Sequence, residues 1–495
     1  MQVEKEEFLG ANIVDCLHYF ANTRAEHPAM EDGQRVISYA ELNQRTDEAA
    51  ANIRDMGISS GTIVTVILGD CIEHLIVICG LARAGAVTFS LNPDLTESEI
   101  RDGMVEAGSK LLIADISAAG LPGIRKIDKK DICAANGIVF GAPGASGEQP
   151  YVLVQSSGTT GKPKSFLLSH AKGLQQCRRA TVVQGMTSED RYVSLPHMCF
   201  HLCRAYFLYL LNIGATLVLA HDRSLKGFHE FVNKQRISYL KVMPSHLFAL
   251  LDYAKDGEIL FPYLRAIGIA GAPITHEQRL LARRILTANL IEEYGSNEAG
   301  VVSFAGPAEQ DAHPDSVGRL LAGIETQIVN EDGQTQAVGE AGLVRFRGGG
   351  IAEEYVDNPE MNSRHFRDGW YYPGDVARLN EAGYIFFLGR ADDIINNSGV
   401  KFYPVEVEGV LLRHPAIVEV AVFAWPHEVA GQVAAAAVVV ESEVTAQQLR
   451  VFCQQHLASY KVPYLIAFTK ELPKNALGKV VKKSVAAHFK ARMRQ

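Results

Sequence analysis

The chain has 495 residues, of which 47% are hydrophobic and 21% are charged, and this balance is typical of a globular enzyme. The length is too great for one ordinary domain and predicts a large domain and a small one. The net charge of −8 argues against nucleic acid as the main partner.

The cysteines and the apolar runs bear on the compartment. The eight cysteines are scattered and form no CxxC pair, so we expect free thiols in a reducing, cytoplasmic setting. The acidic start of the chain lacks the apolar segment of a signal peptide. The apolar run 205–220 is interrupted by Asn212 and Gly214 and falls short of the ~20 residues that a membrane span needs. We therefore expect no membrane span.

Helix and strand patterns alternate along the first 115 residues. Ser38 and Glu41 form a capping box at the start of an amphipathic helix over 38–56. Further strands are expected at 63–68, 86–91 and 110–114, and further helices at 74–82 and 97–106. This alternation predicts a parallel sheet with helices on both faces.

A loop rich in glycine and hydroxyl side chains follows the short apolar strand 151–154. Its residues are Ser156, Ser157, Gly158, Thr159, Thr160, Gly161, Lys162, Pro163 and Lys164. Small residues let backbone N–H groups approach an anion, and the hydroxyl and ammonium groups add donors and positive charge. The loop predicts a polyphosphate site, with a serine-rich surface loop as the alternative. The spacing is not that of a Walker loop, because Pro163 stands where Ser or Thr should bind magnesium.

The helix and strand alternation resumes beyond this loop and predicts a second parallel sheet. Ser169 is placed to cap a helix that begins near His170. The expected strands are 192–195, 216–220 and 239–242, and the expected helices are 202–211 and 245–251.

Two motifs follow expected strands in the next part of the chain. Ala270-Gly271-Ala272-Pro273 is a turn whose small residues permit a flat base to stack on the backbone. Tyr294-Gly295-Ser296-Asn297-Glu298 ends in a carboxylate, a hard oxygen ligand suited to magnesium. Short β segments over 317–350 then predict a small barrel-like subdomain.

The last third of the chain carries four more motifs. The segment 370–375 ends in Asp375, whose carboxylate can accept hydrogen bonds from two hydroxyl groups. A charged turn at 389–393, the segment 398–401 and the basic segment 473–479 follow. Between the last two, strands at 417–424 and 432–440, a helix from Pro404 and a helix over 446–457 predict a compact α+β unit.

Taken in this order, the motifs resemble those of the adenylate-forming superfamily, which comprises acyl- and aryl-CoA synthetases, luciferases and the adenylation domains of peptide synthetases. The matches run from residue 156 to residue 479, so the resemblance covers essentially the whole chain. It implies an α/β fold with a large domain over 1–390, made of two parallel-type sheets flanked by helices and a small β-barrel-like subdomain. A small, mobile α+β domain over 391–495 would follow.

The resemblance also implies which residues bind ATP and Mg²⁺. Catalytic roles go to Lys479, Glu298, Thr159 and Lys164, with Glu298 as the metal ligand. The nucleotide site takes Ser156, Ser157, Gly158, Thr159, Thr160, Gly161, Lys164, Gly271, Ala272, Pro273, Tyr294, Gly295, Asn297, Asp375, Arg390 and Lys479. Asn297 and Pro373 stand where the family carries threonine. The Asn297 amide can still donate to a phosphate oxygen.

The same resemblance outlines the pocket for a carboxylic acid substrate. Its expected residues are His197, Phe200, His201, His246, Ala270, Gly271, Gly295, Ser296 and Val301. His201 replaces the aspartate with which amino-acid-activating members pair the substrate ammonium, so an α-amino acid is disfavoured. The alternative for His197 and His201 is a structural role at the start of a helix. An aryl or medium-length acid is expected.

Motion of the small domain is the last implication. Asp392 would be the hinge, and Gly399, Val400 and Lys401 would line the channel for a thiol after the domain turns. The expected reaction is ligation of the acid to coenzyme A through an acyl-AMP, with release of pyrophosphate. A separate phosphopantetheinylated carrier protein is the alternative acceptor. Luciferase-like oxygenation and a non-catalytic nucleotide-binding role are also compatible with this fold.

Overall fold

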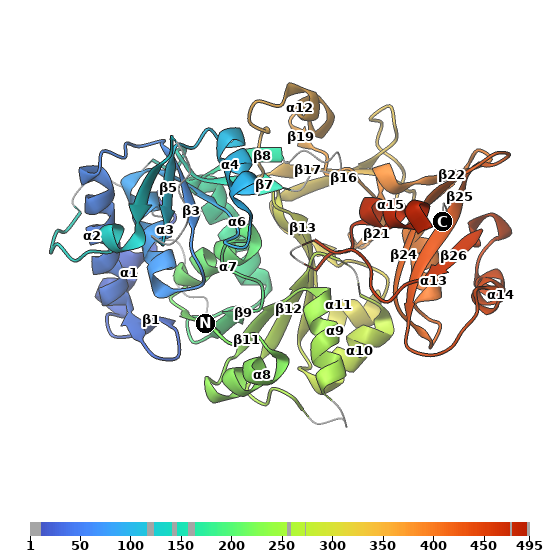
Figure 1. Ribbon diagram of the computed structural model, residues 1–495, viewed down its shortest axis with the longest axis horizontal. Helices are drawn as coiled ribbons and strands as arrows, with labels where there is room; N and C mark the ends of the chain where they lie inside the picture. Colours follow the sequence, from blue (N-terminus) through green and yellow to red (C-terminus); the bar gives the residue numbers. More distant parts are fainter. Residues whose placement is uncertain are drawn as a thin grey trace.

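The structure is a computed structural model that describes residues 11–115, 123–140, 146–156, 164–254, 259–272, 274–475 and 478–492. Four β-sheets organise the chain. Figure 1 shows the amino-terminal elements, blue to teal, on one side of the molecule and the carboxy-terminal elements, orange to red, on the other.

The first sheet has six strands in the order β6-β5-β3-β4-β7-β8. All neighbours are parallel except β7 and β8, which form an antiparallel pair. The strands are β3 (Ile63–Ile67), β4 (Val87–Ser90), β5 (Leu111–Ala114), β6 (Arg125–Asp128), β7 (Pro150–Ser156) and β8 (Lys164–Ser169). The accompanying helices are α1 (Cys16–Thr23), α2 (Tyr39–Asp55), α3 (Ile72–Ala84), α4 (Glu97–Glu106) and α5 (Lys129–Ile132).

The second sheet has nine strands in the order β15-β14-β13-β12-β11-β9-β10-β1-β2. Its six central strands are parallel, and β2, β14 and β15 extend the edges in antiparallel pairs. The strands are β1 (Pro28–Glu31), β2 (Val36–Ser38), β9 (Arg191–Ser194), β10 (Thr216–Val218), β11 (Tyr239–Val242), β12 (Ala266–Ala270), β13 (Leu290–Ser296), β14 (Gly300–Ala305) and β15 (Arg319–Leu320). The helices are α6 (His170–Val183), α7 (His201–Leu211), α8 (Leu225–Lys234), α9 (Pro244–Tyr253), α10 (His276–Ile285) and α11 (Pro307–Ala312).

The two remaining sheets are smaller. The third, β18-β19-β17-β20-β21 with β16 beside β17, is antiparallel throughout; it begins inside the range 317–350, where short β segments were expected, and continues to Arg390. Its elements are β16 (Ile324–Val329), β17 (Gly342–Gly348), α12 (Pro359–His365), β18 (Phe366–Arg367), β19 (Trp370–Tyr371), β20 (Asp375–Leu379) and β21 (Ile385–Arg390).

The fourth sheet, β23-β22-β25-β24 with β26 beside β25, belongs to the carboxy-terminal unit. Its elements are the 3₁₀ turn η2 (Ala391–Asp393), β22 (Ile395–Asn397), β23 (Val400–Phe402), α13 (Pro404–Leu411), β24 (Ile417–His427), β25 (Gly431–Val440), α14 (Ala446–His456), the 3₁₀ turn η3 (Ser459–Lys461), β26 (Leu465–Phe468) and α15 (Lys482–Arg492). The α/β fold class is confirmed.

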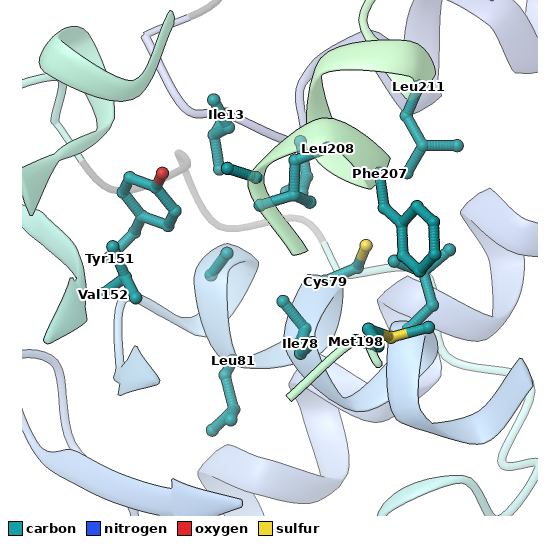
Figure 2. Packing of buried hydrophobic residues seen from close by; sticks show 14 of the residues in the cluster. Ile13, Ile78, Cys79, Leu81, Tyr151, Val152, Met198, Phe207, Leu208 and Leu211 are labelled. Carbon is teal, nitrogen blue, oxygen red and sulfur yellow. The ribbon is translucent and has the colours of Figure 1, made fainter. Parts of the chain in front are cut away.

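A single apolar cluster joins the two large sheets through α3 and α7. Figure 2 shows Ile78 and Cys79 of α3 on the side that faces Phe207 and Leu208 of α7. Every residue of α3 except Glu73 is buried, and most of these residues are apolar, as expected for a helix enclosed by the core. The packing fixes α7 between the sheets, and the residues at its start face the same edge as the strand ends described below.

All eight cysteines are free, as predicted, and most are buried. In the described ranges, no helix combines the length and apolar character needed to cross a bilayer.

One buried ion pair lies in the middle of the second sheet. Lys241 Nζ on β11 lies 2.5 Å from Glu293 Oε1 on β13, and neither side chain is more than 1% exposed. Tyr206 on α7 donates a hydrogen bond to the other Glu293 oxygen at 2.7 Å. The pair therefore ties β11, β13 and α7 together immediately before Tyr294.

Lys241→Met should lower the free energy of unfolding by about 3–5 kcal/mol, because it leaves the Glu293 carboxylate buried without its cation. The double variant Lys241→Met/Glu293→Gln should recover much of that loss. Midpoints of urea denaturation measure both changes. Lys226→Met is the control, because it removes an exposed pair with Glu230 worth less than about 1 kcal/mol. Equal costs for Lys241→Met and Lys226→Met would contradict this account.

Candidate functional site

The candidate site lies where parallel strands of the second sheet end. The carboxyl ends of β9, β11, β12 and β13 meet at one edge, the usual place for a ligand in such sheets. The motif over 270–273 begins at the last residue of β12, and Tyr294, Gly295 and Ser296 form the end of β13.

Tyr294, Asp375 and Arg390 are joined by hydrogen bonds. The Tyr294 hydroxyl donates to Asp375 Oδ2 at 2.6 Å, and Arg390 Nη1 donates to Asp375 Oδ1 at 2.7 Å. Asp375 and Arg390 are register partners on β20 and β21, so the sheet itself brings the two side chains together. The Asp375 carboxylate is buried, and each oxygen keeps one lone pair for a further donor.

Lys164 and Glu298 are linked through Tyr355. The Tyr355 hydroxyl donates to Glu298 Oε1 at 2.9 Å, and Lys164 Nζ lies 5.2 Å from the centre of the Tyr355 ring. Burial lowers the pKa of the Lys164 ammonium, and Glu298 and Asp392 oppose this shift. The expected phosphate-loop lysine, metal carboxylate and hinge residue therefore belong to one electrostatic cluster.

His365 completes this cluster at the end of α12. Its Nδ1 lies 2.6 Å from the Tyr372 carbonyl oxygen, which can only accept, so Nδ1 carries the proton. The other nitrogen, Nε2, is then the acceptor for Lys164 Nζ at 3.0 Å. Burial lowers the pKa of His365 below its ordinary value of 6.5, which keeps the ring neutral beside the ammonium.

The glycine-rich loop connects the two strands of a hairpin. Ser156 and Lys164, the described residues on either side of the loop, are register partners on β7 and β8. Ser157, Gly158, Thr159, Thr160 and Gly161 lie outside the described residues, as does Pro273. The sequence pattern predicted the strand before the loop and missed β8 after it.

Gly295 is packed against backbone and Gly271 against the Met243 side chain. A Cβ on Gly295 would lie 2.1 Å from the Gly300 carbonyl oxygen, and one on Gly271 would lie 2.3 Å from Met243 Cε. Gly271 also has a φ of +101°, which favours glycine. Gly271 and Ala272 are exposed and Ala270 is half-buried, so this turn presents backbone to a ligand.

Ser296 is the last residue of β13, and Asn297 begins the turn between β13 and β14. Ser296 Oγ accepts from the Ala299 N–H at 3.2 Å and donates to the Tyr371 hydroxyl at 3.3 Å. Asn297 is half-buried in the same turn. Ser296 is thus held by the turn itself.

Asp70, which follows β3, connects the first sheet to the expected acid pocket. Its carboxylate accepts from the Met198 N–H at 2.8 Å, contacts His197 Nδ1 at 3.1 Å and pairs with Arg223. Asp70 is not among the residues expected from the sequence. Its place just past a parallel strand was the signal that could have found it.

The other expected pocket residues differ in their surroundings. His246 Nδ1 accepts from the Met243 N–H at 3.3 Å at the start of α9. Phe200 precedes α7 and is half-buried, and Val301 on β14 packs against the main apolar cluster. Burial lowers the pKa of His201 to about 3, and its Nδ1 has no hydrogen-bond partner within the described ranges. A neutral His201 cannot pair with an ammonium.

The carboxy-terminal unit reaches the site through the turn at Gly478. A Cβ on Gly478 would lie 2.3 Å from Ser245 Oγ, so this turn touches the start of α9. The neighbouring Lys479 is exposed to solvent. Surrounding protein lowers the pKa of its ammonium below the ordinary value of 10.5, and the nearby Asp375 carboxylate opposes this shift.

The expected thiol-channel segment lies at the tip of the β22–β23 hairpin. Gly399 has a φ of +89° and donates its N–H to Asn396 Oδ1 at 3.0 Å. Val400 is 45% exposed, and Lys401 pairs at 2.8 Å with Glu331, in the turn that follows β16. The 398–401 segment therefore contacts the turn after β16, whereas the turn that carries Lys479 contacts α9.

The chain matches two family models. The model described as AMP-binding enzyme matches residues 17–356, and the model described as AMP-binding enzyme C-terminal domain matches residues 406–479. Among curated relatives, oxalate–CoA ligase of Arabidopsis thaliana is 28% identical, covering 92% of this chain and 94% of that protein. 2-Succinylbenzoate–CoA ligase of Geobacillus kaustophilus is also 28% identical, with 93% and 94% covered.

Solved structures show the same fold. The o-succinylbenzoate CoA synthetase of Bacillus subtilis, in complex with its acyl-adenylate intermediate, superposes with a TM-score of 0.86 at 24% identity, covering 94% of this chain and 97% of that one. The ATP-bound MatB protein of Rhodopseudomonas palustris gives a TM-score of 0.87 at 23% identity, with 97% and 99% covered.

Proposed function

Because the chain belongs to the family of AMP-binding enzymes, we propose that it is an ATP-dependent acid:thiol ligase. It activates a carboxylic acid as an acyl-AMP, releases pyrophosphate, and passes the acyl group to coenzyme A. The observation that supports this proposal is the contact of the Gly478 turn with Ser245 at the start of α9, next to Lys479, whose pKa is influenced by the Asp375 carboxylate. The domains proposed are 1–390 and 391–495, with the hinge at Asp392.

The first half-reaction brings two anions together. The acid carboxylate attacks the α-phosphorus of ATP, the new O–P bond forms, and the bond to pyrophosphate breaks. The chain's contribution is positioning and charge neutralisation, which supply most of the acceleration in phosphoryl-type transfers. Asp375 would accept from the ribose hydroxyls, Lys164 would bind the leaving phosphates, and Lys479 would bridge the carboxylate and the α-phosphate.

Glu298 fits the expected magnesium. It is a buried carboxylate with one oxygen bonded to Tyr355, and magnesium is usually held by one or two carboxylates together with substrate phosphates. Over the described ranges, no group of three or more His, Cys, Asp or Glu residues could form a cage that holds a metal ion alone. The ion would neutralise charge on the departing pyrophosphate.

The second half-reaction transfers the acyl group from AMP to the thiol of coenzyme A. The thiol sulfur of coenzyme A attacks the acyl carbon, a C–S bond forms, and AMP leaves with its oxygen. Because Lys401 pairs with Glu331, the small domain would have to turn before Gly399 could reach the site. A phosphopantetheinylated carrier protein is the alternative acceptor, and nothing in the named CoA-ligase relatives supports it over coenzyme A.

The class of acid is proposed from the residues of the expected pocket. The curated relatives include ligases named for oxalate, 4-coumarate, 2-succinylbenzoate and long-chain fatty acids, so the fold admits acids of very different length. We propose an aryl or medium-length acid, supported by the small and apolar residues Ala270, Gly271, Gly295 and Val301 at the expected pocket.

Lys479→Ala should abolish formation of the acyl-AMP while sparing formation of the thioester from supplied acyl-AMP, because the ammonium is needed only in the first step. Pyrophosphate release across a panel of acids measures the first step. Thioester formation with coenzyme A and with a phosphopantetheinylated carrier protein measures the second. Lys474→Ala, in the same segment, is the control. Equal loss of both steps in Lys479→Ala would contradict the role.

The activity should fall in acid as His365 gains a proton. Its pKa lies below 6.5, and the protonated ring can no longer accept from Lys164 and repels the ammonium. kcat/KM for ATP should therefore decline as the pH drops through that pKa. His365→Gln, whose amide oxygen still accepts, should lose this decline. The exposed His488→Gln is the control. If kcat/KM for ATP declines at low pH in His365→Gln as it does in the wild type, the role given to His365 is contradicted.

A further inference from the structure

Arg204 is a buried cation without a carboxylate partner in the described part of the chain. It lies on α7, is 3% exposed, and donates from Nη1 to the Cys199 carbonyl oxygen at 3.1 Å. Two other arginines of the described chain are equally buried, and both pair with acids: Arg83 with Asp47 and Arg279 with Glu292. Among the residues that the structure describes, no Asp or Glu forms an ion pair with Arg204.

An unpaired guanidinium in the protein interior is expensive. Removing a cation from water costs several kcal/mol, which is recovered only by a close anion with good hydrogen bonds. One carbonyl oxygen occupies one of the five N–H donors of the group. The planar fork that remains suits a carboxylate, which it can bind through two parallel hydrogen bonds.

Two acids that contact α7 or the loop before it are already engaged. Asp70 is held by Arg223, His197 and the Met198 N–H. Glu293 pairs with Lys241 and accepts from Tyr206. The counter-ion of Arg204 is therefore best supplied by a ligand.

Arg204 lies beside the pocket expected for the acid. Its bond to Cys199 directs the guanidinium back toward the loop between β9 and α7, and this loop belongs to the edge where the strands end. His201 is one turn away on the same helix, and its buried Nδ1 has no partner within the described ranges. Burial, with a contribution from the charge of Arg204, lowers the pKa of His201, so the ring stays neutral and can donate one N–H.

We propose that Arg204, with His201 beside it, binds a second carboxylate of the acid substrate, so that the enzyme acts on dicarboxylic acids. This inference rests on the proposed ligase activity. One carboxylate of the substrate reacts near Lys479, while the other stays ionised at α7 and no bond to it forms or breaks. The second carboxylate supplies a counter-charge for Arg204, and the guanidinium in turn selects against acids with an apolar end.

Matched acids test the inference. Pyrophosphate release is measured with straight-chain mono- and dicarboxylic acids of equal carbon number, and with benzoate against the three benzenedicarboxylates. For at least one pair, kcat/KM should favour the diacid by roughly tenfold or more, the size expected for a charge-assisted hydrogen bond. Arg204→Met should lower the diacid value by a similar factor and leave the monoacid value near that of the wild type. Arg204→Lys should keep part of the preference, and the exposed Arg178→Met should keep all of it.

Several outcomes would overturn the inference without touching the ligase activity. In the first, the wild-type kcat/KM is higher for the monoacid in every matched pair. In the second, Arg204→Met lowers kcat/KM equally for the monoacid and the diacid of a pair. Should Arg204→Met fail to fold, calorimetric binding of the same acid pairs to the wild-type protein decides, and equal affinities contradict the inference. Absence of pyrophosphate release with every acid counts against the ligase proposal. Calorimetry then still tests whether the diacid binds more tightly than its monoacid.

Discussion

The contact between the Gly478 turn and α9 is the constraint on which the rest of the site depends. A Cβ on Gly478 would lie 2.3 Å from Ser245 Oγ, so the turn lies directly against α9, and the charge of Asp375 acts on the pKa of the neighbouring Lys479 ammonium. The position of the Lys479 charge matters for the proposed reaction. The proposed reaction joins two anions, and a cation supplied by a separate domain can be present for that step and absent for the next.

The large domain contributes groups that are held before any ligand arrives. Register pairing on β20 and β21 fixes Asp375 against Arg390, and the Tyr294 hydroxyl closes the set from the neighbouring sheet. Tyr355 and His365 hold Lys164 and Glu298 in the same way. Such bonds limit the reorganisation needed when charge develops, which is how preorganised sites lower barriers. Arg204 stands apart, because its charge has no paired anion among the described residues.

The sequence predicted the elements whose signals are local. The helix expected at 97–106 matches α4 in full, because Thr96 and Glu99 form a capping box that marks its start. The sequence did not predict strand β8, because this strand is defined by its antiparallel pairing with β7 and not by the hydrophobic pattern of its own residues. His365 was missed for a related reason: it contacts Lys164 across 201 residues of chain, and nothing near it in sequence marks that contact.

A reversible crosslink tests the central claim, that one domain orientation serves adenylate formation and another serves thioester formation. A Cβ on Gly478 would lie 3.2 Å from Ser245 Cβ, close to the ~3.5–4.5 Å that disulfides require. In the variant Ser245→Cys/Gly478→Cys, oxidation should preserve formation of the acyl-AMP and block formation of the thioester until a reductant is added. Each single variant should be insensitive to oxidation. Thioester formation at an undiminished rate by the oxidised double variant would contradict the account.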